Sequence, residues 1–209
     1  FNLECDADVV IFPPNVYISD AVEAFSGASI AVGAQDVSEN SRGAYTGEIS
    51  SEMLVDVGCE YCIVGHSERR SLFGEDNHKI AGKFYQASEV GLTPILCLGE
   101  TLNQREKDET LDVITAQLNA VVEYTGKVFP SDLVVAYEPI WAIGSGTSAN
   151  TDQIQIVHTH IRCKVREKGI SAKLMYGGSV THEDTTAPLQ EQAMDGLLVS
   201  GTSIDADSY

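Results

Sequence analysis

Residues 136–146 read AYEPIWAIGSG, and this stretch decides the fold. An apolar run over residues 133–138 ends in the carboxylate of Glu138, and a proline follows at once, as at the end of a buried strand. Pro139, Ile140 and Trp141 on one side, and a Gly-Ser-Gly triplet on the other, resemble two hinges around a short rigid tip. We therefore expect Glu138 to be a general base at the foot of a closing loop. We call residues 139–146 the lid.

Short apolar runs alternate with longer amphipathic stretches along the rest of the chain. The apolar runs are typical of strands buried on both faces, and they occupy residues 8–13, 29–35, 61–65, 93–99, 133–138, 173–177 and 196–200. The amphipathic stretches predict helices at residues 16–25, 50–58, 78–90, 111–125, 152–168 and 187–193. Several of these helices follow a Ser, Thr or Asp that can act as an N-cap. The alternation predicts parallel strands with helical crossovers.

Two parallel architectures fit this order, and the positions of polar residues separate them. A doubly wound sheet gathers its site at one switch point, whereas a barrel draws residues from many strand ends. Residues suited to a site lie at or just past the carboxyl ends of six of the predicted strands: Gln35, His66, Glu100, Glu138, Gly177 and Ser200. This distribution favours a barrel. No GxGxxG or GxxxxGK[ST] sequence follows the first strand, so the common nucleotide-binding fingerprints are absent from this sequence.

A histidine follows the predicted strand at residues 61–65, at the start of a predicted short helix. This residue is His66, within the string GHSERR at residues 65–70. A helix N-terminus disfavours an imidazolium, and a neutral imidazole can donate a hydrogen bond to a carbonyl oxygen. Taken alone, a histidine at a strand end is more often structural. The remaining histidines fall in predicted helices or loops, where we expect them to be solvated: His78, His158, His160 and His182.

These strings, in this order, resemble the triosephosphate isomerase family over essentially the whole chain. The lid, GHSERR at residues 65–70, ILCLGE at 95–100 and YGGSV at 176–180 carry the resemblance. It implies a TIM (β/α)8-type barrel and a single domain over residues 1–209. It also implies Glu138 as the catalytic base and His66 as the group that polarises the substrate carbonyl.

The resemblance implies further roles for particular residues. The residues that would bind the substrate phosphate, largely through backbone N–H groups, are Gly144, Ser145, Ser179, Ser200 and Gly201. Glu68 and Cys97 would support the catalytic pair, although simple core packing is at least as good an interpretation of Cys97. The family needs neither a metal ion nor an organic cofactor.

The ends of the sequence depart from the family pattern. The first apolar run resembles the second strand of the family, and the Gly-Asn-x-Lys sequence that ends the family's first strand has no counterpart here. The last helix begins at about residue 205 and stops at Tyr209. We therefore expect a short form that lacks the first βα unit and the final helix, which is an incomplete barrel of seven parallel strands.

Two functions remain open at this point. The first is interconversion of dihydroxyacetone phosphate and glyceraldehyde 3-phosphate by Glu138 and His66, in glycolysis and gluconeogenesis. The expected activity is weak or absent without the substrate-binding lysine, which stabilises negative charge in the family. The alternative is a catalytically inactive truncated barrel that keeps a phosphate-binding cup, or that serves as a scaffold or assembly subunit.

Composition restricts the partners. The net charge is −18, from 13 basic and 31 acidic residues, which disfavours nucleic acids and anionic membranes. Five cysteines form an odd set, and the one Cys-x-x-Cys sequence, Cys59 to Cys62, has no second pair with which to bind zinc. We read them as reduced thiols of a cytoplasmic protein. Residues 44–48 match the loop tip that family dimers insert into a neighbour, so a homodimer is expected, with a monomer as the alternative.

Overall fold

The structure is a computed structural model that describes residues 7–126, 130, 132–143, 148–178 and 194–201. The chain divides into two compact units. The first comprises Phe1–Val64, Glu75–Ile95 and Val121–Phe129, and the second comprises Gly65–Gly74, Leu96–Ala120 and Pro130–Tyr209. Strand β4 (Thr93–Leu98) and helix α6 (Thr110–Thr125) therefore contribute residues to both units.

Parallel strands in chain order form the sheet of the first unit. These strands are β1 (Val9–Ile11), β2 (Ile30–Ala34) and β3 (Tyr61–Val64). Val9 is aligned with Ile30, and Gly33 with Tyr61. The first part of β4 follows β3, and the Thr93 N–H donates to the Glu60 carbonyl at 2.8 Å.

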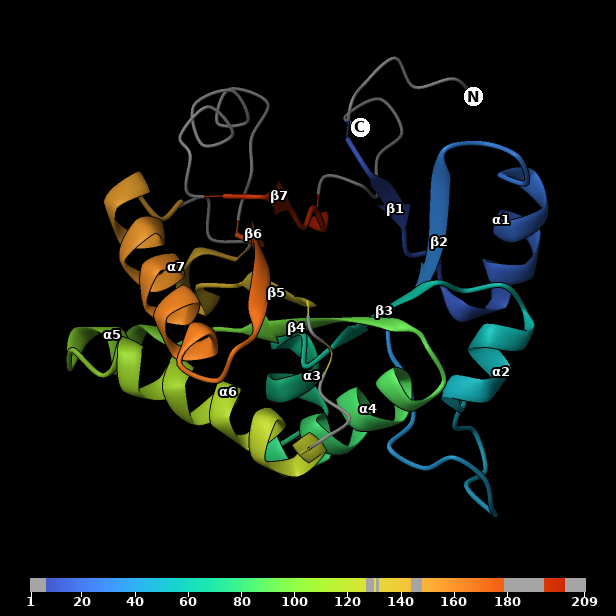
Figure 1. The fold of residues 1–209 in the computed structure, drawn as a ribbon, viewed down its shortest axis with the longest axis horizontal. Helices are drawn as coiled ribbons and strands as arrows, with labels where there is room; N and C mark the ends of the chain where they lie inside the picture. Colours follow the sequence, from blue (N-terminus) through green and yellow to red (C-terminus); the bar gives the residue numbers. More distant parts are fainter. Residues whose placement is uncertain (1–6, 127–129, 131, 144–147, 179–193, 202–209) are drawn as a thin grey trace. The chain divides into compact units, whose positions relative to one another are not determined.

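The helices of the first unit begin at polar caps or in short turns. They are η1 (Asn15–Tyr17), α1 (Ile18–Ala24), α2 (Ser51–Asp56) and α4 (Asn77–Glu89). The Ser50 hydroxyl caps α2 by accepting from the Met53 N–H, and the Asp76 carboxylate caps α4 by accepting from the Lys79 N–H. Helix α1 packs against β2, and α4 packs against β3 (Figure 1).

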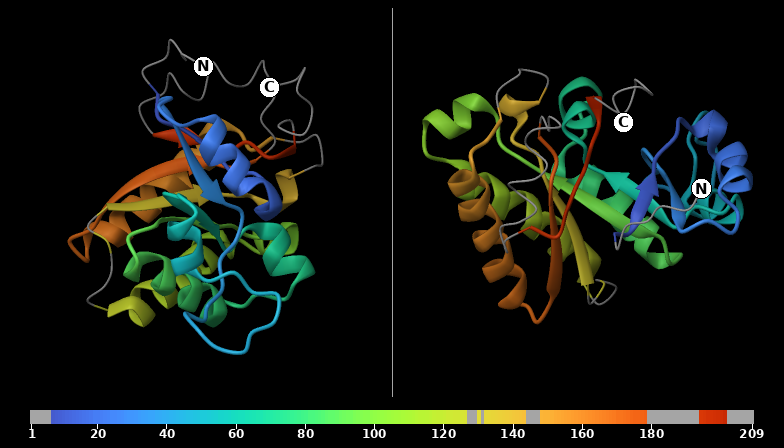
Figure 2. Two further views of the ribbon diagram at one scale, coloured as in Figure 1. Left: turned by 90° about the vertical axis from the view of Figure 1, so that its right-hand side faces the viewer. Right: turned by 90° about the horizontal axis from the view of Figure 1, so that it is seen from above.

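The second unit continues the same strand order. After the last part of β4 come β5 (Asp132–Tyr137), β6 (Ser171–Tyr176) and β7 (Gly196–Leu197). Strands β5 and β6 are parallel and aligned from Asp132 with Ser171 to Tyr137 with Tyr176. Helix α7 (Thr151–Arg166) packs against both of them (Figure 2). The shorter helices are α3 (Ser67–Leu72), α5 (Leu102–Glu106) and η3 (Ile140–Ala142).

All seven predicted strands are present, and hydrogen-bonded neighbours follow chain order from β1 to β7. A doubly wound sheet reverses its strand order at a switch point, whereas a barrel does not. The predicted TIM-type arrangement of seven parallel strands is therefore confirmed within the described residues. Sequential parallel order places the carboxyl ends of neighbouring strands at one edge, which is where site residues gather within the second unit.

Boundaries differ from the sequence prediction in a few places. Strand β6 begins two residues before the predicted start at Lys173, because exposed positions alternate with covered ones there and give no continuous apolar run. Helix α5 was not predicted, since its five residues carry no apolar stripe; a capping box between Thr101 and Gln104 starts it. The helix predicted at residues 187–193 lies outside the described residues. In the described part of the chain, no helix combines the length and apolar character needed to cross a membrane.

Candidate active site

Glu138 follows β5 directly and is held tightly at its backbone. Its N–H donates to the Leu98 carbonyl at 2.7 Å, and its side chain is 2% exposed. Two glycines make room for it. A Cβ on Gly99 would overlap the Glu138 carbonyl oxygen, and a Cβ on Gly177 would lie 2.9 Å from Glu138 Cγ. The glycines at these two strand ends are therefore required by close approach to Glu138.

The Glu138 carboxylate meets the start of α3. Its Oε2 accepts a hydrogen bond from the Ser67 N–H at 2.9 Å, and its Oε1 lies 3.1 Å from Nε2 of His66. Burial raises the pKa of Glu138 above the usual range, and the nearby imidazole and the Ser67 hydrogen bond oppose that rise. A carboxylate in this environment binds a proton more strongly than a solvated one does, which suits a general base.

His66 caps α3, and this contact selects its tautomer. Nδ1 accepts a hydrogen bond from the Glu68 N–H at 3.3 Å, so it carries a lone pair rather than a proton. The proton of a neutral ring then lies on Nε2, which is the nitrogen nearest Glu138. The imidazole therefore presents an N–H donor beside the carboxylate, within the second unit.

Cys97 lies in β4, and its side chain is fully buried. Burial raises the pKa of Cys97 well above its usual range, and the negative charge of Glu138 adds to the rise, so the sulfur stays a neutral thiol. Arg70 fixes the surrounding backbone: it donates to the Gly65 carbonyl at 2.9 Å and to the Cys97 carbonyl at 3.1 Å.

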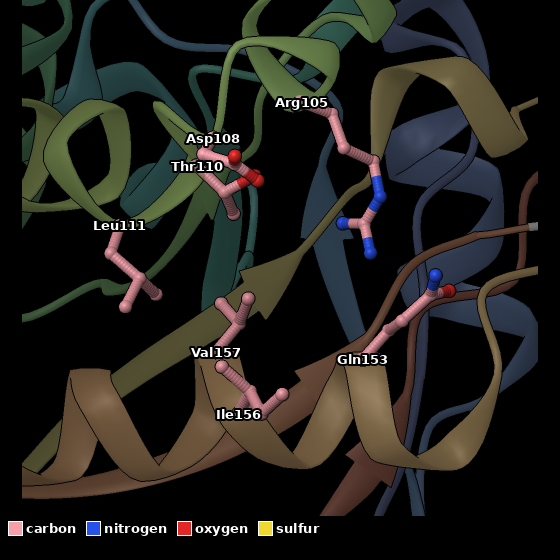
Figure 3. A pocket seen from close by; sticks show the side chains of 7 residues that line it. All are labelled: Arg105, Asp108, Thr110, Leu111, Gln153, Ile156 and Val157. Atoms are coloured by element: carbon pink, nitrogen blue, oxygen red, sulfur yellow. The ribbon is translucent and has the colours of Figure 1, made fainter.

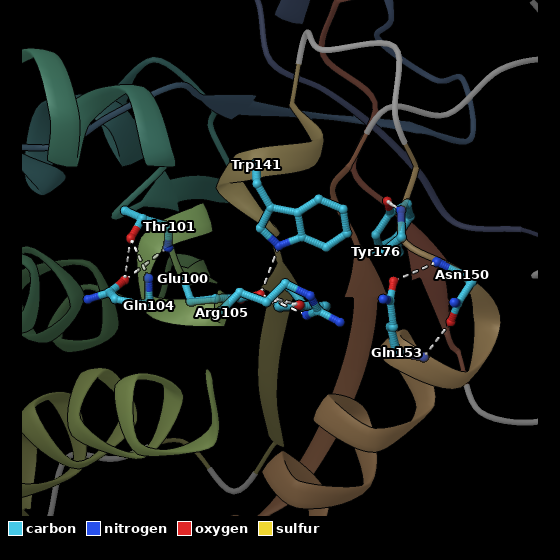
Figure 4. Close-up of polar contacts among 10 residues, drawn as sticks. Glu100, Thr101, Gln104, Arg105, Trp141, Asn150, Gln153 and Tyr176 are labelled. Atoms are coloured by element: carbon cyan, nitrogen blue, oxygen red, sulfur yellow. Dashed lines mark hydrogen bonds and ion pairs between the residues drawn. The ribbon is translucent and has the colours of Figure 1, made fainter. Parts of the chain in front are cut away.

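The first flank of the lid is anchored on Glu100, at the carboxyl end of β4. Glu100 Oε1 accepts from the Trp141 indole N–H at 2.9 Å and from Nη1 of Arg105 at 3.0 Å (Figure 4). The Tyr137 hydroxyl donates to both Glu100 oxygens at 3.1 Å. Burial and the Glu100 charge raise the pKa of Tyr137, so the phenol remains a donor. Arg105 also stacks on the Trp141 ring, 4.7 Å from its centroid.

The segment that follows the lid is anchored on β6. The Ala149 N–H donates to the Tyr176 hydroxyl at 3.2 Å (Figure 4). Immediately afterwards, a capping box between Asn150 and Gln153 starts α7. Both flanks of the lid are thus tied to strand ends, while residues 144–147 lie outside the described part of the chain.

Comparison with known proteins agrees with this geometry. A family model described as triosephosphate isomerase matches residues 2–209. The chain belongs to the triosephosphate isomerase family. It is 45% identical over 209 residues to the triosephosphate isomerase of Halorhodospira halophila, covering 98% of this chain and 84% of that protein. The same named protein of Methylococcus capsulatus is 45% identical over 210 residues, 99% of this chain and 84% of the relative. The triosephosphate isomerase of Xanthomonas campestris is 47% identical over 206 residues, which cover 97% of this chain and 82% of that protein.

The predicted site residues of this triosephosphate isomerase relative fall into four groups. His66, Glu138 and Cys97 lie together, as described above. The Glu68 side chain is 68% exposed, and its carboxylate lies 3.9 Å from Nδ1 of His66. The Glu68 backbone N–H donates to that nitrogen. Ser200 and Gly201 are exposed after β7. Gly144, Ser145 and Ser179 lie outside the described residues, and no cluster of metal-ligating side chains occurs among those that are described.

The sequence prediction missed some contacts and misjudged two histidines. Arg105 and Tyr176 were not singled out, because nothing local connects them to the lid. His158 was expected to be solvated, but it is 1% exposed on α7 and packs edge-on against the Tyr137 ring at 6.2 Å. The apolar face of α7, with Ile154, Val157 and Ile161 buried, also carries His158 inward. His160 was also expected to be solvated, but it is half-buried and its Nε2 lies 2.7 Å from the Thr115 hydroxyl. His78 is exposed, as expected, and His182 lies outside the described residues.

Proposed function

We propose that this protein catalyses the interconversion of dihydroxyacetone phosphate and glyceraldehyde 3-phosphate. The observation that supports this best is the pairing of Glu138 Oε1 with Nε2 of His66 at 3.1 Å. A buried carboxylate with a raised pKa supplies the base, and an imidazole whose Nε2 carries the proton supplies the donor. Relatives of 45–47% identity named triosephosphate isomerase favour the enzyme over the inactive barrel.

The chemistry moves one proton between adjacent carbons. Glu138 removes a proton from the carbon next to the substrate carbonyl, and the electron pair forms an enediolate whose charge rests on oxygen. The Nε2–H of His66 hydrogen-bonds that oxygen and passes protons between the two oxygens. Glu138 then returns its proton to the neighbouring carbon. No atom is gained or lost, so the two trioses are isomers and the residues return to their starting states.

The substrate phosphate requires local donors, because the chain carries a net charge of −18. We assign it to the backbone around Gly144, Ser145, Ser179, Ser200 and Gly201. A Cβ on Gly201 would meet nothing within 4 Å, so the backbone at this position is open to a ligand. Backbone N–H groups bind a phosphate without requiring basic side chains, which suits so acidic a chain.

A coupled isomerase assay tests the proposal. Glu138→Gln keeps the shape of the side chain and an acceptor for the Ser67 N–H but removes the base, so kcat should fall by about 10²–10⁴-fold. Glu106→Gln, at an exposed position of α5, is the control, and its kcat should change little. Far-UV circular dichroism confirms folding of both variants. A folded wild-type protein without isomerase rate, but with calorimetric binding of 2-phosphoglycolate, would support the inactive barrel instead.

The family resemblance also suggests an association state and a location. We propose that the protein is a homodimer, and that it is located in the cytoplasm. Large apolar side chains of the first unit are exposed and suit a second copy of this chain: Val16, Tyr17, Tyr45 and Met53. Sedimentation equilibrium distinguishes a dimer from a monomer, and Tyr17→Glu should weaken the dimer.

A further inference from the structure

A hollow of about 300 Å³ lies in the second unit, away from Glu138 and His66. Its walls come from the end of α5, the turn that follows, the start of α6 and the first part of α7 (Figure 3). This volume is at the lower end of the range for pockets that bind small molecules, about 300–1,000 Å³. The hollow is therefore matched in size to a small metabolite.

One end of the hollow is rich in hydrogen-bond donors. The Arg105 and Gln153 side chains point toward each other across it (Figure 3). Arg105 uses Nη1 for Glu100, and within the described residues Nε and Nη2 have no hydrogen-bond acceptor. Gln153 accepts from the Asn150 N–H through Oε1, which leaves its amide N–H groups as donors. A guanidinium edge beside an amide is a good match for a carboxylate.

The other walls of the hollow supply a negative charge and an apolar surface. Asp108, in the left-handed region with φ of 59°, carries a carboxylate without an ion-pair partner among the described residues. Leu111, Ile156 and Val157 form the apolar part, and Ile156 is 58% exposed. An exposed branched side chain in such a hollow gains free energy when an aliphatic group covers it.

We propose that this hollow binds a small zwitterion with a branched aliphatic chain, an α-amino acid of the size of leucine. Its carboxylate lies on Arg105 and Gln153, its ammonium on Asp108, and its aliphatic chain on Leu111 and Ile156. A zwitterion adds no net charge. A simple anion, in contrast, would be repelled both by the Asp108 carboxylate and by the net charge of −18.

The site is linked to the lid through Arg105. The same guanidinium binds Glu100 at 3.0 Å and stacks on Trp141. When the carboxylate of the bound zwitterion accepts from the remaining N–H groups of Arg105, it fixes the position of the guanidinium. Because that guanidinium stacks on Trp141, binding also changes the environment of the indole. Trp141 is the one tryptophan of the 209-residue chain, so its fluorescence reports this link directly. The inference goes beyond the proposed isomerase function and does not depend on it.

Titration of the full chain with L-leucine tests the proposal. We expect saturable calorimetric binding with a Kd on the order of 1 mM, accompanied by a saturable change in Trp141 emission. 4-Methylpentanoate lacks the ammonium and isoamylamine lacks the carboxylate, so each should bind about tenfold more weakly. Asp108→Asn should weaken leucine binding and strengthen 4-methylpentanoate binding.

A matched pair of variants on α7 shows whether the hollow is the site. Ile156→Glu places a carboxylate in the apolar wall and should weaken leucine binding more than about tenfold. Gln155→Glu adds the same charge at the neighbouring exposed position and should leave the Kd unchanged. Circular dichroism establishes that both variants are folded. Absence of saturable binding by folded wild-type protein, or equal binding by both variants, overturns the proposal.

Discussion

The backbone N–H of Ser67 donates a hydrogen bond of 2.9 Å to Oε2 of Glu138, across 71 residues of sequence. The preceding residue, His66, caps the same helix through Nδ1 and places Nε2 3.1 Å from the other carboxylate oxygen. One helical turn therefore orients both groups that the proposed reaction needs. The proposed catalytic pair is positioned by α3 as much as by the strand ends.

The first prediction concerns pH. Since burial raises the pKa of Glu138, kcat/KM should fall as the pH is lowered through that raised pKa, at a pH above the usual glutamate range. A raised carboxyl pKa means that the folded state binds the proton more tightly than the unfolded chain. The contribution of Glu138 to stability therefore declines as pH rises above the unfolded pKa.

Profiles of kcat/KM against pH measure the effect on the rate, and urea unfolding across the same pH range measures the effect on the free energy of unfolding. Glu138→Gln cannot titrate, so its free energy of unfolding should lose this part of the pH dependence. An acid limb of kcat/KM within the ordinary glutamate range would contradict the assignment of Glu138 as the buried base.

The second prediction concerns the space beside the base. In Gly177→Ala the new Cβ would lie 2.9 Å from Glu138 Cγ, so the side chain must shift. Displacement of a catalytic group by about 1 Å costs about 10²-fold in rate, and we expect kcat to fall on this scale while the protein stays folded. The control is Gly196→Ala on β7, where the added Cβ would meet Met175 at an ordinary 3.4 Å. Equal rates for the two variants would refute this role of Gly177.

The third prediction concerns the anchor of the lid. Glu100→Leu removes the acceptor shared by Tyr137, Trp141 and Arg105, and leaves the buried Tyr137 hydroxyl without that acceptor. The free energy of unfolding should fall by about 2–4 kcal/mol, and Trp141 emission should shift to the red as the indole loses its anchor. Glu106→Leu, at an exposed position of α5, should show neither change. A stable variant with unchanged emission would mean that Glu100 does not hold the lid.

Local pattern accounts for part of what could be predicted. Glu138 and His66 each lie at the end of an apolar run, and parallel order brings such strand ends together. The resemblance to the family, rather than this pattern, assigned His66 its role beside the base. Glu100 was likewise placed at a strand end, but its partners Arg105 and Trp141 lie 5 and 41 residues away with no period that connects them. Tyr176 reaches Ala149 over 27 residues for the same reason. Side-chain hydrogen bonds between elements depend on rotamers and packing, which periodicity does not encode.

The last prediction concerns stability and the extent of the domain. In the first unit, Nζ of Lys83 lies 2.6 Å from Asp36 and 2.5 Å from Glu75, and its side chain is 1% exposed. Lys83→Met keeps the length of the side chain but removes the ammonium between two carboxylates. Removal of one partner from a buried ion pair costs about 3–5 kcal/mol. The exposed pair of Lys79 and Glu39, at 3.9 Å, provides the control, and Lys79→Met should cost less than about 1 kcal/mol.

Trp141 lies in the second unit, so its fluorescence shows whether the loss at Lys83 spreads through the chain. If residues 1–209 form a single domain, as the sequence predicts, urea unfolding of Lys83→Met gives one transition. Trp141 fluorescence and far-UV circular dichroism then share one lowered midpoint, because a cooperative unit unfolds as a whole. A Trp141 midpoint that stays at the wild-type value while the dichroism midpoint falls would show that the two units unfold separately, and the single-domain prediction would be wrong.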